Sequence, residues 1–493
     1  MNDLETHEVQ FWTDSFHEGV WAAEQLASRW RLVERDFLVG FVPTYVFEIR
    51  PDERLRVTVY GSYESWSPLP DKIQDLLGWG KPDIVVYDVK TDKIILALEE
   101  TAAVPTGNQG AQRCERLFGA ARAKIPFGFL LGEFGQHLDG NSRRDSIWAT
   151  LQALKLTLIE ATCSIVAHYG ERDSPDAYHL GTGRTAIFRL VALLTEQHFG
   201  ENVASEVHKL LIVLYQEMLD FVQSQRAKIT NFLPGSELLV LGGVADLFAQ
   251  RSQGSATDPA LAPFGQWPLA AATPSGVWRD SANIGFRVPD LFLEEIHRLI
   301  DRRRAYTLTN RSGSKPQPRE DIARNIERQR TLYGSDRNLP NAQFGLHLGL
   351  FPASSESLHH VSTSLRTNYL IDSIEELFGA ANLGFPRRAN LAAIDRDAPD
   401  MPAFLFVCNS LTPGRMFGDP YTGQLAQLAP IFCRDVTGRR NRAFVAYYPH
   451  QSHTQLTHAW DTTNKGIQIL TECVDYAIFH SGVIVDVKNR TWA

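Results

Sequence analysis

The spacing of apolar side chains divides the first part of the chain into segments of different expected structure. Apolar residues recur near a 3.6-residue period within residues 1–40, which predicts a helix there. They are Phe11, Phe16, Val20, Ala23, Leu26 and Trp30. From residue 41 to residue 63 the pattern changes to two short β-type runs, FVPTYVFEI and LRVTVYGSY. Residues 65–82, rich in Pro, Ser and Gly, are expected to form a loop.

A β-hairpin is the clearest local element that the pattern predicts. The runs IVVYDV (84–89) and IILALEET (94–101) are apolar enough to be buried strands, and the polar residues 90–93 between them suit a turn. A helix is expected from Gln109 to Ala123, followed by a buried strand, IPFGFLL. This order of elements predicts a mixed α/β fold in which helices flank a mixed sheet.

Three regions are predicted along the chain. Residues 1–145 form the α/β core, and residues 146–250, which include LQALKLTLIEATCSIVAHY, form a helical layer packed on that core. Residues 250–277 are rich in Ser, Gly, Pro and Ala and are expected to be a linker or long loop. Residues 275–493 form an additional C-terminal α/β region with the strand-like runs AFLFVC, AFVAYYP and YAIFHSGVIVDV.

Composition is typical of a folded protein of more than one domain. The chain has 493 residues, 44% of them hydrophobic and 22% charged, which is too long for one ordinary core. Its five cysteines are scattered without a CxxC pair, which favours a reducing cytoplasm over a disulfide framework. The acidic start has no signal-peptide pattern, and the apolar runs are too short for a membrane span. A cytoplasmic protein is therefore expected.

Three carboxylates lie at the open end of the predicted hairpin: Asp83, Glu99 and Glu100. Residues opposite one another on one face of a hairpin lie ~5 Å apart, so a hairpin can hold two ligands for one divalent ion. A turn centred between Thr91 and Asp92 places residue 83 opposite residue 100, whereas a turn centred on Thr91 places it opposite residue 99. Spacing alone leaves this choice open.

These residues resemble the PD-(D/E)XK nuclease superfamily, which includes many restriction endonucleases. Pro82-Asp83 stands for the PD element and Glu99-Glu100-Thr101 for the (D/E)-x-K element, over roughly residues 1–135. The resemblance selects Asp83 and Glu99 as ligands of Mg²⁺, a hard ion that takes one or two carboxylates together with water and phosphate. It also implies a restriction-endonuclease-like mixed sheet flanked by helices.

The sequence departs from the family pattern at Thr101, where the family has the lysine that orients or activates the attacking water. Glu100, Gln112 and Lys124 are the local candidates to replace it. Glu18 and Glu64 are candidates for the accessory acidic residue that the family takes from an upstream element. The expected catalytic set lies within the hairpin and the helix after it: Asp83, Glu99, Glu100, Thr101 and Gln112.

Two arginine groups are candidates for contacts with nucleic acid. Arg113 and Arg116 lie on neighbouring positions of the predicted helix, whose N-terminus suits a phosphate. Arg302, Arg303 and Arg304 begin a basic segment, residues 302–337, in a chain of net charge −8. The alternative for both groups is a solvated helix face, such as one with Glu320 paired to Arg324. Beside a nuclease centre, contact with DNA is favoured.

The resemblance implies a magnesium-dependent DNA endonuclease of a restriction or phage-defence system, acting on double-stranded DNA as a homodimer. One alternative is a nuclease of repair, of a mobile element or of RNA. Another is a nucleic-acid-binding protein on a nuclease-derived fold without catalysis, which Thr101 favours and the buried carboxylates oppose. A zinc site is not favoured, because the spacings among Cys433, His450, His453, His458 and Cys473 lack a close Cys or His pair of the kind found in structural zinc sites.

Overall fold

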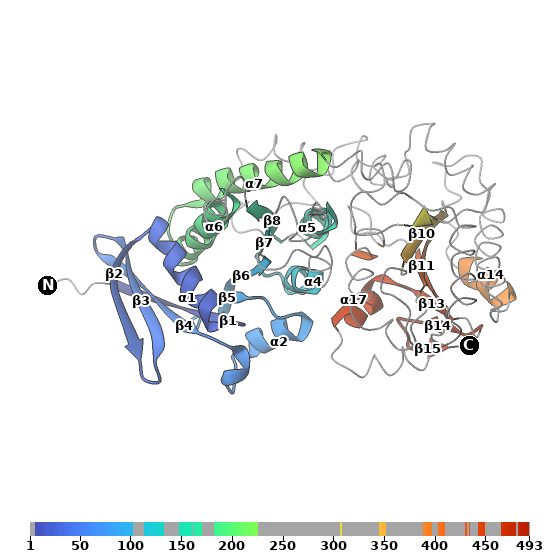
Figure 1. The fold of residues 1–493 in the computed structure, drawn as a ribbon, viewed down its shortest axis with the longest axis horizontal. Coiled ribbons are helices and arrows are strands. Elements are labelled where there is room, and N and C mark those ends of the chain that lie inside the picture. The colour runs from blue at the N-terminus through green and yellow to red at the C-terminus, as the bar shows by residue number, and fades with distance from the viewer. Residues whose placement is uncertain are drawn as a thin grey trace, which may run out of the picture. The chain divides into compact units, whose positions relative to one another are not determined.

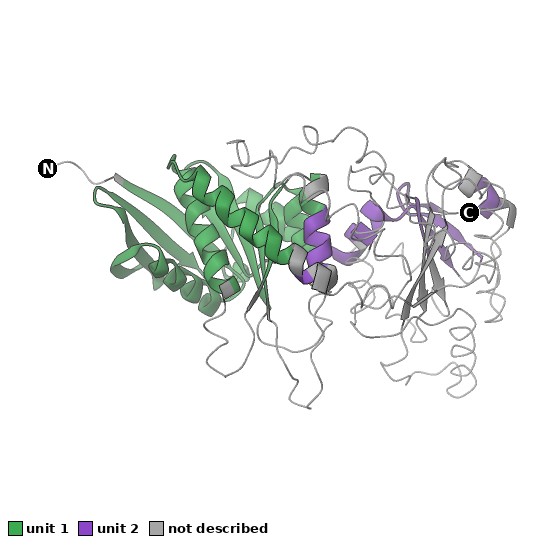
Figure 2. Cartoon of the chain, turned by 90° about the horizontal axis from the view of Figure 1, so that it is seen from above, with its two compact units in different colours: residues 1–143, 156–220, 250–269 green, residues 144–155, 221–249, 270–493 purple. Residues whose placement is uncertain are grey.

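The chain forms two compact units in a computed structural model that describes residues 5–101, 113–132, 147–160, 162–169, 182–224 and shorter segments between residues 306 and 492. The first unit comprises residues 1–143, 156–220 and 250–269, and the second comprises residues 144–155, 221–249 and 270–493 (Figure 2). Both units are discontinuous in sequence. The candidate carboxylates lie in the first.

An eight-stranded mixed sheet forms the centre of the first unit, in the order β2-β3-β4-β1-β5-β6-β7-β8. The strands are β1 Glu5–Thr13, β2 Arg31–Leu38, β3 Val42–Arg50, β4 Glu53–Tyr60, β5 Ile84–Asp88, β6 Lys93–Thr101, β7 Phe127–Gly132 and β8 Ser164–Tyr169. The neighbours β4 and β1, β6 and β7, and β7 and β8 are parallel, and the other neighbours are antiparallel. The predicted mixed sheet is confirmed.

Helices cover both faces of this sheet (Figure 1). They are α1 Phe16–Gln25, α2 Asp71–Trp79, α4 Cys114–Arg122, α5 Ile147–Glu160, α6 Thr182–His198 and α7 Ala204–Ser224, with short 3-10 turns at Leu26–Ser28 and Tyr63–Ser65. On one face α6 packs over β6, β7 and β8, where Ile187 lies beside Gly128 and Leu98. On the other, α4 packs against β7 and α2. The predicted α/β class with flanking helices is confirmed.

The interpretation of residues 1–40 as one helix is wrong, because only Phe16–Gln25 is α-helical among the described residues 5–40. The segment Glu5–Thr13 is a central strand that pairs with β4 on one side and β5 on the other. Its alternate residues Val9, Phe11 and Thr13 are buried, and so is Trp12 on the opposite face. Phe11 and Trp12 are neighbours in sequence and are buried on opposite faces, which interrupts the alternation, and Phe11 also fits the helical period of the residues after it.

Two further segments differ from the predicted elements. The expected loop 65–82 contains α2, which buries Ile73 and Leu76 at helical spacing. The helical layer expected over residues 146–250 contains helices α5, α6 and α7, but its segment SIVAHY is strand β8. Its consecutive buried residues suit a parallel strand covered on both faces. The helix expected from residue 109 begins at Cys114, and residues 109–112 lie outside the described residues.

The second unit contains a seven-stranded sheet in the order β15-β14-β13-β12-β11-β10-β9. Its strands are β9 Tyr306–Thr307, β10 Gly345–Phe351, β11 Ala403–Asn409, β12 Arg442–Tyr448, β13 Tyr476–Phe479, β14 Ile484–Asp486 and β15 Thr491–Trp492. The helices described between residues 306 and 492 are α14 Arg388–Arg396 and α17 Lys465–Cys473. The three strand-like runs expected at the C-terminal end are confirmed.

Several expectations fall outside the described residues. They concern the linker 250–277, the histidines His450, His453 and His458, and the basic segment 302–337 apart from Tyr306–Thr307. Arg302, Arg303 and Arg304 are among these residues. Within the part of the chain that the structure describes, no helix is both long enough and apolar enough to cross a bilayer.

Candidate active site

The register of the β5–β6 hairpin places Asp83 opposite Glu99. Ile84 pairs with Leu98, so the next position outward brings residue 83 against residue 99. Glu99 also points to the face opposite Leu98, which is the face that α4 covers. Both carboxylates are buried, with exposed fractions of 4% for Asp83 and 0% for Glu99. The predicted antiparallel hairpin is confirmed, and the choice that spacing left open falls on Glu99.

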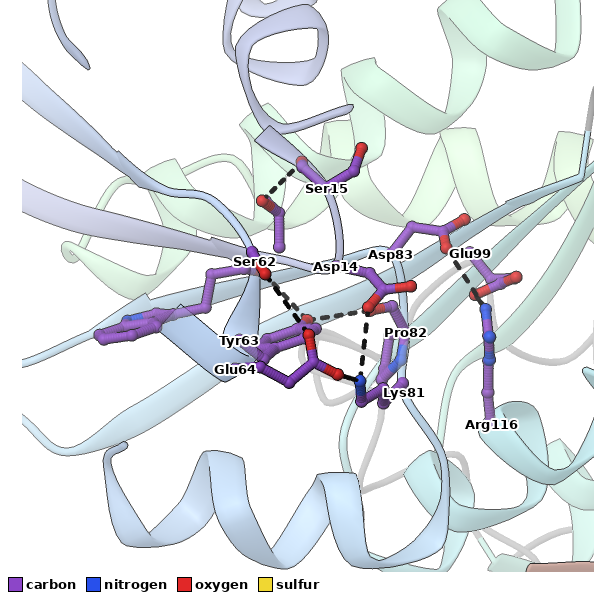
Figure 3. Close-up of polar contacts among 12 residues, drawn as sticks. Asp14, Ser15, Ser62, Tyr63, Glu64, Lys81, Pro82, Asp83, Glu99 and Arg116 are labelled. Atoms are coloured by element: carbon purple, nitrogen blue, oxygen red, sulfur yellow. Dashed lines mark hydrogen bonds and ion pairs between the residues drawn. The ribbon is translucent and has the colours of Figure 1, made fainter. Parts of the chain in front are cut away.

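Arg116 of α4 contacts both carboxylates with a single nitrogen atom. Its Nη1 lies 3.3 Å from Asp83 Oδ1 and also donates a hydrogen bond to Glu99 Oε2. Figure 3 shows the Arg116 side chain directed at Glu99, with Asp83 beside it. Two carboxylates that meet at one nitrogen are close enough for one cation to bridge them. The expectation that their side chains share a face of the sheet is confirmed.

Arg113 and Glu100 complete the immediate surroundings. Arg113 Nη1 lies 2.9 Å from Glu99 Oε1, but it donates its hydrogen bond to the carbonyl oxygen of Glu100 at 2.7 Å. Glu99 Oε1 therefore accepts no hydrogen bond from the described residues, although it is buried. The backbone N–H of Glu100 donates to Asp83 Oδ2 at 2.6 Å, so residue 100 orients the first carboxylate through its main chain.

Burial raises the pKa of both carboxyl groups. The pKa of Asp83 is raised to about 8 by burial and by the charge of Glu99, with Arg116 acting in the opposite direction. The pKa of Glu99 is raised by burial to about 7, and Arg116 and Arg113 oppose this rise. Burial alone lowers the pKa of Arg116, but its attraction to Glu99 and Asp83 outweighs that effect and raises it. Burial therefore favours the protonated form of both carboxyl groups, and a nearby cation favours the ionised form.

The two accessory acidic candidates have different surroundings. Glu18, in the first turn of α1, contributes to the raised pKa of Asp83, and its Oε2 is buried with no hydrogen bond from the described residues. Ser15 caps this helix by accepting a hydrogen bond from the N–H of Glu18 at 3.3 Å. Glu64 instead pairs with Lys81, whose Nζ also lies 3.7 Å from Asp14 (Figure 3). The structure thus associates Glu18, rather than Glu64, with the carboxylate pair.

Among the candidates to replace the missing lysine, Glu100 lies beside Asp83, whereas Lys124 lies away from it. Lys124 follows the C-terminal end of α4, and its Nζ lies 2.9 Å from Glu160 Oε2. Arg122, the last residue of α4, lies about 9 Å along the helix from Arg116, so Lys124 is at the far end from the carboxylates. Thr101 ends β6 opposite Leu131. Its side chain, like all of Gln112, lies outside the described residues.

Sequence analysis missed three residues that support this site. The buried hydroxyl of Tyr63 lies within hydrogen-bonding distance of the carbonyl oxygens of Pro82 (2.9 Å) and Trp12 (3.1 Å). The N–H of Asp14 donates to the carbonyl oxygen of Asp83 at 2.9 Å. Gly80 lets this segment approach α4, since an added Cβ would lie 2.9 Å from Arg116 Cα. A glycine shortly before Pro82-Asp83 was the one available signal.

No protein-family model, curated protein or solved structure matches this chain. The assignment of a function therefore depends on the residues of the site.

The carboxylate pair has the donor chemistry of a magnesium site. Asp83 and Glu99 offer oxygen atoms from two buried carboxylates, and Glu99 Oε1 accepts no hydrogen bond within the described part of the chain. Mg²⁺ commonly takes one or two carboxylates and completes its coordination with water and phosphate. No set of three or more His, Cys, Asp and Glu side chains among the described residues could hold a metal ion. The pair fits Mg²⁺ in this two-carboxylate form, with Arg116 already in contact with both ligands.

Proposed function

We propose that the first unit is a magnesium-dependent phosphodiesterase that cleaves DNA. One observation carries this proposal: Asp83 and Glu99 lie buried and opposite each other at the end of a hairpin, and both contact the same cationic atom. Two ionised carboxylates are costly to bury, and a purely structural hairpin has no need of them. A site for a divalent cation gives both a role.

The chain's own residues would have distinct roles in hydrolysis. Asp83 and Glu99 would hold Mg²⁺, which when bound polarises the phosphoryl oxygen and makes water a stronger acid. The N–H of Glu100 keeps the Asp83 carboxylate oriented, and the Tyr63 hydroxyl and the Asp14 N–H hold the segment that carries it. Arg113 lies just before α4 and Arg116 lies in its first turn. Both would provide guanidinium groups for the phosphate.

The resemblance to PD-(D/E)XK nucleases supports a more specific role. Pro82-Asp83 directly precede β5 and Glu99-Glu100-Thr101 end β6, an arrangement compatible with the two elements of the motif. We therefore propose a restriction or phage-defence endonuclease that acts on double-stranded DNA as a homodimer. Arg302, Arg303 and Arg304 would add contacts to the phosphate backbone.

A DNA-binding protein without catalysis is the second candidate. Arg116 already neutralises part of the charge of the carboxylates, and Thr101 replaces the lysine of the motif. In that case the pair would serve only to anchor α4 on the hairpin.

The two candidates differ in one direct experiment. The purified protein is incubated with plasmid and phage DNA in Mg²⁺ or in EDTA, and the products are separated on a gel. Discrete fragments that require Mg²⁺ support a sequence-specific endonuclease, and a smear supports a nonspecific one. Intact DNA that is shifted on a native gel would instead support the binding protein.

A further inference from the structure

Arg116 stands where a bound ion would have to make its contacts. We propose that Arg116 is an internal counter-ion that exchanges partners: a divalent ion displaces its guanidinium from Asp83 and Glu99, and the released guanidinium binds the phosphate of the substrate. This inference rests on the proposed function, because it concerns the same carboxylate pair. It assigns Arg116 two successive partners rather than one structural salt bridge.

The charges of the four central groups support the exchange. With both carboxylates ionised, Asp83 and Glu99 carry two negative charges, which Arg113 and Arg116 balance. A divalent ion on the carboxylates would balance them by itself, and the guanidinium groups of Arg113 and Arg116 would lose these two carboxylates as partners. A phosphodiester is an anion that guanidinium binds with two parallel hydrogen bonds. Binding of the ion would thus favour binding of a phosphate at the same site.

The packing of α4 allows the side chain to move while the helix stays in place. The main chain of Arg116 is pressed against Gly80, and Gly119 one turn later is pressed against Trp79. The guanidinium contacts both carboxylates through Nη1. Its Nε is buried and donates no hydrogen bond to the described residues. The side chain is 16% exposed, so part of it reaches solvent. Rotation about the side-chain bonds would therefore be enough to release it.

Arg113 and Arg122 differ from Arg116 in ways that define the test. Arg113 donates to the main-chain carbonyl of Glu100, a contact that a bound ion does not replace. Arg122, at the other end of the same helix, lies 3.3 Å from Glu160 and about 9 Å along the helix axis from Arg116. Arg122→Gln is therefore a matched control. It removes a partly buried arginine of the same helix from its ion pair with Glu160 of α5.

The test measures the two affinities that the exchange couples. Binding of Mn²⁺, which prefers the same oxygen ligands, is followed by electron paramagnetic resonance, and binding of a short DNA duplex is followed in Ca²⁺ by fluorescence anisotropy. Arg116→Gln should bind Mn²⁺ about tenfold more tightly, which corresponds to ~1.4 kcal/mol. It should also bind DNA about tenfold more weakly, and Arg122→Gln should change neither affinity. These opposite shifts are the signature of a partner exchange.

Other outcomes are decisive in the other direction. If Arg116→Gln weakens or leaves unchanged the binding of Mn²⁺ while the wild-type protein binds it, Arg116 is a structural residue and the exchange is wrong. If the wild-type protein and Arg116→Gln both fail to bind Mn²⁺, the proposed metal site itself fails.

A measurement on the wild-type protein covers the case in which Arg116→Gln does not fold. Coupled sites affect each other equally, so duplex DNA should tighten Mn²⁺ binding by the same factor by which the ion tightens DNA binding. An affinity for Mn²⁺ that is independent of DNA would overturn the exchange.

Discussion

Asp83 and Glu99 face each other one position beyond the Ile84–Leu98 pair and share Nη1 of Arg116 as a cationic partner. Their proximity is set by strand register and not by a loop. A shift of one residue in the hairpin would turn Glu99 toward α6 and bring Glu100 into its place. Such a shift would also exchange the faces of the buried side chains 94–98 of β6.

The first prediction concerns the two carboxylates in catalysis. Asp83→Asn and Glu99→Gln each remove a charged ligand while keeping nearly the same shape. Hydrolysis of DNA should fall by several orders of magnitude, because water activation and neutralisation of the phosphate depend on the ion. DNA binding should persist or tighten, since a negative charge near the phosphate is lost. Cleavage assays and gel shifts measure the two effects separately.

Glu48→Gln is a suitable control for these variants, because Glu48 of β3 forms an ion pair with Arg31 of β2 in the same sheet. It should cleave DNA like the wild-type protein. Retained cleavage in Asp83→Asn or Glu99→Gln would rule out the proposed centre, and equal loss of binding in both would indicate a structural role for the pair.

The second prediction concerns stability as a function of pH. The pKa of Asp83 is raised to about 8, so between about pH 4 and pH 8 the folded protein retains a proton that the unfolded chain has lost. Raising the pH through this window therefore lowers the free energy of unfolding. Asp83→Asn removes this loss, and its melting temperature should exceed that of the wild-type protein by at least about 2–4 °C at pH 8.

The measurement is thermal unfolding in EDTA, followed by circular dichroism at pH 5, 6.5 and 8. At pH 5 the two proteins should differ less than at pH 8. Parallel curves for the two proteins would show that Asp83 does not titrate in this range.

The third prediction uses two glycines with contrasting surroundings. A Cβ on Gly119 would lie 2.2 Å from Trp79 Cβ, whereas a Cβ on Gly78 would meet nothing within 4 Å in the described part of the chain. Gly119→Ala should destabilise the protein by about 1–3 kcal/mol through overpacking. Gly78→Ala, inside α2, should stabilise it by about 0.5–1 kcal/mol through the lower backbone entropy of the unfolded chain. Urea unfolding compares both variants, and equal effects would contradict the close packing of α4 on α2.

The fourth prediction concerns the missing lysine. Lys124 is held by Glu160 at the end of α4 away from the carboxylates, so Lys124→Ala should leave the rate of DNA cleavage within about twofold of wild type. Thr101→Ala should also cost much less than the carboxylate variants. A loss of several orders of magnitude in Lys124→Ala would mean that this ammonium group reaches the reacting water. Steady-state cleavage rates at saturating Mg²⁺ provide the comparison.

The fifth prediction comes from sequence alone, because Arg302, Arg303 and Arg304 lie outside the described residues. Replacing all three with alanine should weaken DNA binding and flatten its dependence on the logarithm of salt concentration by up to about three units, about one for each lost phosphate contact. Binding isotherms between low and moderate salt give this slope. An unchanged slope would assign the segment to a solvated surface.

The hairpin could be predicted from sequence because its information is local. Two apolar runs of strand length flank a polar turn, and their open end carries carboxylates. The register stayed open because β5 and β6 contain an irregularity between Val86 and Tyr87, which moves the pairing by one residue. No simple count from the turn accounts for such a shift.

The parts that could not be predicted depend on contacts between distant segments. Arg116 was expected to bind phosphate, but its contact with both carboxylates requires α4 to lie close to the hairpin, which Gly80 and Gly119 permit. Tyr63 supports Pro82 from a turn that no periodic pattern marks. Strand β1 was missed because burial on both faces removes the alternation that identifies a strand.

The position of β1 in the sheet has a consequence for how the first unit assembles. Residue 5 pairs with residue 53, and residue 10 pairs with residue 87. Strand β1 is therefore synthesised well before the strands β4 and β5 with which it pairs. The entropy cost of closing such long loops must be met before the strand contacts form. Pairing between distant segments therefore slows folding. Because β1 lies between β4 and β5, a truncation of the first thirteen residues would remove an interior strand of the sheet and not an edge strand.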